Sequence, residues 1–300
     1  MENTTHDTRN PLYSTISRAS EIVLDLVIFL LAGGYITLVL IRKTFRSNHL
    51  NWPTVNIALT TALFVLVHLI FTFTHLQNWS IVSCRIQGFL VDMTACQMMY
   101  AYCTSSFTRL LVIRYFTKPI FRSSSWLSTS IIISWLAGFL SAIPHALYDN
   151  FACMHRESPI LFKVYTCVTT ILLPVLIVSL CNISIFRYIK QASRRIHHAN
   201  NNYKNTGHHM SNKRDLRLTK IMFLTFSLFL LGWMPILLQG LFLTSDHQLP
   251  PVISIILELI LPMTVLGQMI LLIYANQPIC QFLKEKLKHN NRFLYIIKLS

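Results

Sequence analysis

Seven long apolar stretches occupy most of this 300-residue chain. Each reaches about 20 residues, the length that a helix rising ~1.5 Å per residue needs to cross ~30 Å of hydrocarbon. The sequence therefore predicts seven transmembrane helices. Their expected bounds are Ile22–Ile41, Thr54–Thr74, Gln87–Ile113, Leu127–Leu147, Leu161–Ile185, Ile221–Phe242 and Val252–Tyr274.

The composition excludes an ordinary soluble protein. Apolar residues make up 53% of the chain and charged residues only 12%, so a water-exposed surface of this composition would aggregate. The apolar runs are continuous and lack the alternation of lipid-facing and lumen-facing residues that barrel strands show. We therefore expect an all-α membrane protein, a seven-transmembrane helix bundle with a short amphipathic helix after the last span.

We expect the bundle to form one domain. Residues 21–275 make up the seven-transmembrane domain, residues 1–20 an extracellular amino-terminal segment, and residues 276–300 a cytoplasmic tail that holds the amphipathic helix. The amino-terminal segment is polar and lacks the apolar core of a cleavable signal peptide, so the first span is expected to act as a signal anchor.

The basic excess gives the orientation of the chain. The net charge is +15, and 20 of the 26 Lys and Arg lie in segments that the seven-span order places on one side of the membrane. Because such loops are usually cytoplasmic, we expect an extracellular amino terminus and a cytoplasmic carboxyl terminus. The charge is thus a topology signal with a secondary role at anionic membrane lipids, and it does not indicate a nucleic-acid partner.

Several residues near the span ends are candidates for covalent modification. Cys84 and Cys153 fall on the outer side, where the oxidising compartment favours a disulfide between them. Asn3 and Asn78 stand in glycosylation sequons on the same side. Cys280, just past the last span, is either a palmitoylation site or an unmodified thiol.

The third and sixth spans carry a recognisable pattern. Arg109 follows Cys84 by 25 residues, about 37 Å of helix, so both belong to one long span. The sixth span contains Phe-x-x-x-Trp-x-Pro. With these features the sequence resembles the rhodopsin-like (class A) G-protein-coupled receptors, and the resemblance covers all seven spans. The other residues at family positions are Trp135, Pro144, Pro174, Phe229, Trp233, Pro235 and Tyr274.

The chain departs from the family pattern at four places. Thr108 replaces the acid before Arg109, Thr61 the aspartate of span 2, Ile270 the asparagine of span 7, and Asn182 the tyrosine of span 5. The resemblance implies that losing the aspartate and the asparagine removes the polar centre to which the family binds sodium. We therefore expect no sodium regulation in this divergent member.

The resemblance also implies a resting-state lock. An arginine at the hydrocarbon edge is costly unless it is paired, and the nearest replacement for the missing acid is Asp215, before span 6. An Arg109–Asp215 pair would tie span 3 to span 6 until span 6 moves outward. The alternative is an arginine that extends to lipid phosphates without any switching role.

Other residues stand at the family's switch positions. Pro235 removes a backbone hydrogen bond and kinks span 6, so a rotation near Trp233 displaces the cytoplasmic end of the helix. Met99, Pro174 and Phe229 match the packing switch beneath the ligand, although Phe229 fits an ordinary aromatic core residue equally well.

The ligand is harder to predict. Asp92 lies about 12 Å of helix beyond Cys84, and an intramembrane acid is a functional candidate by default. It stands one position after the aspartate with which the family binds amines, which disfavours an amine receptor. Each candidate has the alternative of a hydrogen bond between helices. The candidate pocket residues are Asp92, Ala95, His68, Thr166, Ile236, Leu237, Gln239, Glu258 and Ile260.

No enzyme signature is present, because the chain lacks a phosphate loop, metal-spaced His and Glu on one helix, and Gly-x-Ser-x-Gly. The histidine pairs of residues 191–220 fit a solvated basic loop better than a metal site, and we expect no cofactor. Residues 278–288 have the pattern of an interfacial helix. We expect a receptor that binds an unknown extracellular ligand and activates a heterotrimeric G protein; the alternative is a small polytopic transporter or channel.

Overall fold

The computed structural model describes residues 11–46, 51–74, 81–115, 118–148, 160–199, 223–228, 230–235, 251–276, 278–282 and 285. Every regular element in these residues is helical, which confirms the predicted all-α class. In chain order the elements are α1 (Pro11–Ile41), α2 (Lys43–Arg46), α3 (Trp52–Thr74), α4 (Ile81–Arg114), η3 (Pro119–Arg122), α5 (Ser124–Tyr148), α7 (Ile160–Thr166), the π-helix η4 (Cys167–Leu172), α8 (Leu173–Ala199), the Phe223–Pro235 helix and α10 (Pro251–Ala275).

The helices match the predicted spans but are often longer. Among the described residues, five helical stretches are long and apolar enough to cross a membrane: Thr15–Ile41, Trp52–Phe73, Ser124–Pro144, Leu161–Tyr188 and Ile255–Ala275. The third predicted span corresponds to α4, whose 34 residues exceed the length required. Its more polar sequence, which includes charged residues, explains why hydropathy identifies it less clearly. The sixth predicted span is represented by the shorter Phe223–Pro235 helix.

Two boundaries differ from the prediction. The first helix begins at Pro11, within the segment expected to precede the membrane, because Pro is well placed in the first turn of a helix. The fifth span continues as α8 to Ala199, so the first part of the expected basic loop is helical.

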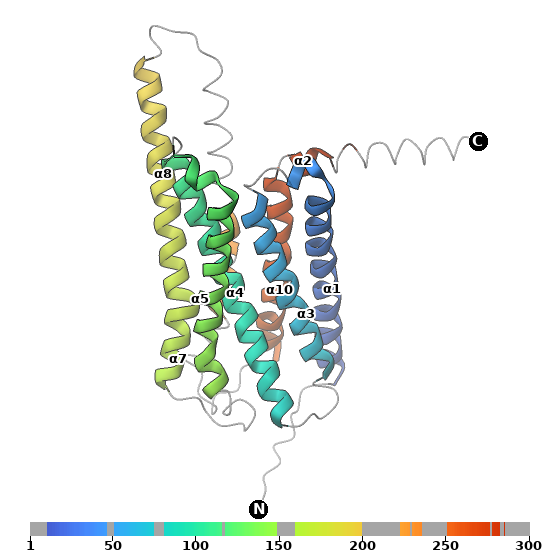
Figure 1. Cartoon of the computed structure of the whole chain (residues 1–300). Helices are drawn as coiled ribbons and strands as arrows, with labels where there is room; N and C mark the ends of the chain where they lie inside the picture. The colour runs from blue at the N-terminus through green and yellow to red at the C-terminus, as the bar shows by residue number, and fades with distance from the viewer. Residues whose placement is uncertain are drawn as a thin grey trace, which may run out of the picture.

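The helices stand side by side as a bundle (Figure 1). α4 packs against α3, α5 and α8, while α1 packs against α3 and α10. The short helix α2 marks one end of the bundle, which we call the α2 end (Figure 1). Helices α1, α4, α8 and α10 finish at this end, whereas α3 and α5 begin there. Because α4 packs against three other long helices, it is the central helix of the bundle.

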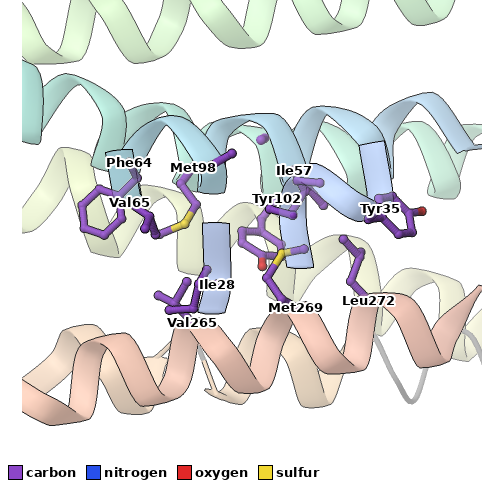
Figure 2. Packing of buried hydrophobic residues seen from close by; sticks show 14 of the residues in the cluster. Ile28, Tyr35, Ile57, Phe64, Val65, Met98, Tyr102, Val265, Met269 and Leu272 are labelled. Carbon is purple, nitrogen blue, oxygen red and sulfur yellow. The ribbon is translucent and has the colours of Figure 1, made fainter. Parts of the chain in front are cut away.

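Most of the buried side chains in the bundle are apolar, and so is its outer surface. Buried side chains from α1, α3, α4 and α10, including Ile28, Ile57, Met98 and Met269, interlock along the axis (Figure 2). On the outside, large apolar side chains such as Leu30 are mostly exposed. An apolar exterior of this extent is stable only when lipid covers it.

Hydrogen bonds between helices fix how α3, α4 and α5 fit together. The indole N–H of Trp135 donates to Asn56 Oδ1 at 2.9 Å, which joins α5 to α3. Gln97 Nε2 of α4 donates to the carbonyl of Trp135 at 2.6 Å. Gly138 makes room for this amide, because a Cβ there would lie 2.7 Å from Gln97 Cδ. The glycine therefore allows α4 and α5 to approach closely.

The Phe223–Pro235 helix meets α10 through two glycines. A Cβ added to Gly232 would overlap the hydroxyl of Thr264, and one added to Gly267 would lie 3.2 Å from Leu228 Cδ1. Small residues let two membrane helices approach closely, and dispersion contacts then hold them together. This contact positions the helix that carries Trp233.

Substituting Gly232 tests this packing. We expect Gly232→Ala to lower the melting temperature of the detergent-solubilised protein, because overpacking of a close helix contact typically costs about 1–3 kcal/mol. Gly34→Ala is the matched control, since nothing lies within 4 Å of a Cβ at that position. Adding Thr264→Ala should restore part of the loss. Equal melting temperatures for the Gly232 and Gly34 variants would contradict the close contact.

Candidate functional site

A polar cluster closes the α2 end of the bundle. The hydroxyls of Tyr35 and Thr54 lie 2.8 Å apart, joining α1 to α3. Asn276 Nδ2, just after α10, donates to Tyr35 Oη at 3.2 Å and to Asn51 Oδ1 at 3.1 Å. Asn51 Nδ2 in turn donates to the carbonyl of Phe45 at 2.9 Å. The cluster joins α1, the start of α3 and the end of α10. All of its hydrogen-bonding groups are neutral, which avoids placing an unpaired charge in an apolar medium.

The chain after α10 turns back over this cluster. Residues 278–282 are helical, and Ile279 is completely buried. The ring of Phe282 meets Phe45 edge-on at 6.2 Å, while the guanidinium of Arg42 lies 4.7 Å from the same ring. The apolar face predicted for this segment thus packs on α2. Cys280, the candidate palmitoylation site, is half-buried here and its thiol is free.

Arg109, the predicted coupling residue, lies in α4 near the α2 end and is half-buried. The neighbouring Thr108 directs its hydroxyl to the carbonyl of Thr104 at 2.8 Å, within the same helix. Thr108, which replaces the family's acid, therefore uses its hydroxyl in a hydrogen bond to the backbone of its own helix. The proposed partner of Arg109, Asp215, lies outside the described residues, so the lock stays a prediction.

The middle of the bundle has a neutral polar centre. Tyr102 Oη of α4 donates to Gln268 Oε1 of α10 at 2.9 Å, and both side chains are buried. Nearby on α3, the hydroxyl of Thr61 lies 3.7 Å from the sulfur of Met98. A hydroxyl beside a thioether takes the place where the family has a carboxylate. Thr61 and Met98 therefore offer no formal charge to a bound cation.

The residues predicted for the switch lie on adjoining helices. The Trp233 side chain is buried, with its ring 5.8 Å from that of Phe64 on α3. Met99 is buried in α4, and one turn further on the thiol of Cys103 points to the carbonyl of Pro174 at 3.8 Å. Pro235 ends the described part of its helix, and Phe229 is outside the described residues.

Tyr274, predicted as a switch at the end of the seventh span, has a different setting from the buried tyrosine at this end. Its side chain is 47% exposed, whereas Tyr35 is 3% exposed and bonded within the polar cluster. Asn182, at the position of the family's span-5 tyrosine, is buried in α8. At the α2 end, Tyr35 of α1 thus makes a tyrosine contact between helices.

The candidate ligand residues on α4 lie close in sequence to a contact between α4 and the fifth span. Asp92 is half-buried and Ala95 is buried. The next residue, Cys96, lies with its sulfur 3.9 Å from the hydroxyl of Thr170 in η4. Thr166 directs its hydroxyl to the carbonyl of Phe162 at 3.0 Å. The π-helix widens the fifth span beside α4, and such bulges are frequent at functional sites.

Another candidate, His68, has a charged partner. Its Nδ1 lies 2.7 Å from Asp25 Oδ2, so the pair joins α3 to α1 inside the bundle. Ile260 is half-buried on α10. No group of three or more His, Cys, Asp or Glu in the described part of the chain is placed to hold a metal ion.

The remaining predicted positions are not tested by the geometry. Ile236, Leu237, Gln239 and Cys153, together with Asn3 and Asn78, lie outside the described residues. Cys84 and Glu258 belong to α4 and α10, but their side chains are not described.

Sequence reasoning missed several polar contacts. Tyr35, Asn51 and Asn276 form the cluster at the α2 end, Tyr102 bonds Gln268, and the ring of Phe64 meets Trp233. A usable signal was present, because hydroxyl and amide groups inside apolar stretches usually bond a neighbouring helix. What the sequence lacked was the identity of each partner.

Comparison with known proteins agrees with this geometry. Residues 34–277 match the family model described as "7 transmembrane receptor (rhodopsin family)". The fold is similar to the crystal structure of squid rhodopsin, with a TM-score of 0.72 at 15% sequence identity over 92% of this chain and 85% of that one. No curated protein sequence matched the chain. Since the family model covers far more than half of the chain, this protein belongs to the rhodopsin family of seven-transmembrane receptors and is a multi-pass membrane receptor, not an enzyme.

Proposed function

We propose that this receptor binds an extracellular ligand among the helix ends opposite α2 and activates a heterotrimeric G protein at the α2 end. The observation that carries the proposal is the placement of Arg109. This arginine lies in the central helix close to the α2 end and is half-buried, so outward movement of the Phe223–Pro235 helix would open it to a partner. Pro235 supplies the kink through which a rotation at Trp233 reaches the end of that helix.

The charge of the α2 end supports a cytoplasmic orientation. Five exposed basic residues lie there, between α1 and α3 and around the end of α4: Arg42, Lys43, Arg46, Arg114 and Lys118. Basic loops of this kind are retained on the cytoplasmic side, where anionic lipids also favour them. The amino terminus and the opposite end of the bundle then face the outside.

The ligand site is proposed at the end opposite α2. Asp92 and Ala95 on α4 and Thr166 on α7 would form one wall, and Asp92 favours a ligand with a cationic or hydrogen-bond-donating group. The other proposed pocket residues are His68, Ile236, Leu237, Gln239, Glu258 and Ile260.

Covalent features follow from the same orientation. Cys84 and Cys153 would be joined at the outer face, which would anchor the loop after α5 to the start of α4. Asn3 and Asn78 would carry glycans on this side. Cys280 would be acylated at the cytoplasmic membrane surface, where it lies beside a segment already packed on α2.

The receptor assignment has a direct test. A ligand screen with a promiscuous G-protein reporter should identify a compound that recruits G protein to cells expressing the protein, with no accompanying ion or solute flux. Arg109→Ala should abolish recruitment at matched surface expression. Arg114→Ala, an exposed basic residue in the last turn of the same helix, is the control and should keep most of the response. Solute flux without G-protein recruitment would favour a transporter or channel instead.

The proposed lock predicts constitutive activity. If Asp215 restrains Arg109, Asp215→Asn should raise ligand-independent signalling, because the resting state loses a pair that contributes about 1–3 kcal/mol, or roughly 5- to 150-fold in the equilibrium. The measurement is basal G-protein activation at equal surface level, with Asp215→Glu as the charge-conserving control. Unchanged basal activity in Asp215→Asn would mean that packing alone, including the Gly232 contact, holds span 6.

A further inference from the structure

A charged pair lies inside the bundle between α1 and α3. Asp25 is 3% exposed, and its Oδ2 lies 2.7 Å from His68 Nδ1. His68 stands about 24 Å along α3 from Trp52, far from the α2 end. A buried carboxylate in a membrane helix is costly unless a hydrogen-bonded partner compensates it. The pair therefore has a structural role, but it also contains the side chain whose ordinary titration falls in the physiological pH range.

The histidine is in contact with the span-6 tryptophan through one aromatic ring. One turn before His68, Phe64 stacks on the imidazole with ring centroids 6.1 Å apart and planes 18° apart. Phe64 also contacts Trp233, with ring centroids 5.8 Å apart and ring planes at 55° to each other. Phe64 also belongs to the buried core, next to Met98 (Figure 2). Three contacts thus connect a carboxylate on α1 with the Phe223–Pro235 helix.

Protonation changes each part of this connection. A carboxylate only accepts hydrogen bonds, so His68 donates through Nδ1–H and its Nε2 is the atom that gains a proton. The added proton changes the charge of the pair from −1 to 0 and turns the stacked imidazole into a cation. A cation about 6 Å from an aromatic centroid is attracted to the ring, so protonation strengthens the contact with Phe64. The His68 side chain is 26% exposed and the Asp25 side chain is 4% exposed, so the histidine is the more accessible partner of the pair.

The surroundings contain few competing charges. Glu21, one turn before Asp25 on α1, also acts electrostatically on His68. On α4 the charged residues of this half are Asp92, which acts on Cys96, and Arg85, whose side chain is not described. The described side chains of α3 and the Phe223–Pro235 helix include no ionisable group other than His68, and those of α10 only Tyr274. Glu258 also belongs to α10, and its side chain is not described.

We propose that Asp25 and His68 form a proton-binding site, and that its occupation holds Phe64 against Trp233 and so stabilises this arrangement of the Phe223–Pro235 helix. The proton acts as a ligand, because it binds one arrangement of the rings more tightly than another. The inference goes beyond the proposed function. It rests on the proposed function only in the step from a change at Trp233 to a change in signalling. A test at Trp233 itself therefore keeps the two apart.

The test uses the full-length receptor in nanodiscs of uncharged phosphatidylcholine, without ligand or G protein. Tryptophan fluorescence is recorded from pH 8 to pH 5.5, and the contribution of Trp233 is obtained by subtracting the spectrum of Trp233→Phe. We expect a single-proton transition in this difference signal. The double variant Asp25→Asn/His68→Phe, which leaves no unpaired charge and keeps an aromatic ring, should lose it.

Two further variants separate the proton site from its connection to Trp233. Asp25→Asn alone keeps a hydrogen bond without the charge, so the midpoint should move by one pH unit or more toward acid. Phe64→Leu should reduce the amplitude at Trp233 at least twofold. His145→Phe, a histidine on α5, is the control and should keep the wild-type curve. A flat wild-type signal, or a double variant that titrates like wild type, would overturn the proton site; an unchanged amplitude in Phe64→Leu would overturn the connection.

Discussion

The structure depends on hydrogen bonds that α4 and its neighbours make where no water is available. In hydrocarbon a polar group has no solvent partner, so each bond between helices selects one position of one helix against another. Gln97 bonds the backbone of α5, and Tyr102 bonds Gln268 of α10. Because apolar side chains pack almost as well after a small slide, these polar contacts fix the register of a bundle whose faces are mostly apolar.

The glycine contacts complete this arrangement at the Phe223–Pro235 helix. The Phe223–Pro235 helix is held to α10 by the close approach at Gly232 and to α3 by the ring contact of Trp233 with Phe64. Contacts of this kind consist of dispersion and shape and carry little directional bonding. The proposed activation would require this helix to move against these contacts. The polar cluster around Tyr35 holds α1, α3 and the end of α10 together.

The sequence predicted the helical class and the approximate spans because length and apolarity alone determine what crosses a bilayer. It also predicted Trp233 as a switch residue on the sixth helix, and the side chain is buried there. It did not predict partners. His68 was predicted as a ligand residue, but its pairing with Asp25 was not predicted, because 43 positions separate the two residues and only the packing of α1 on α3 brings them together. The sequence likewise did not predict that Tyr274 is exposed. The apolar pattern near the end of a helix does not determine whether a given side chain there points into the bundle or away from it.

The most direct test of this account is a double-mutant cycle on Tyr102 and Gln268. If their hydrogen bond fixes α4 against α10, Tyr102→Phe and Gln268→Leu should each destabilise the receptor in lipid, and the double variant should lose less than the sum of the two. The coupling expected for one such bond is about 0.6 kcal/mol, within a range reaching ~1.7 kcal/mol. Strictly additive losses would contradict the account, because they would mean that apolar packing alone positions these helices.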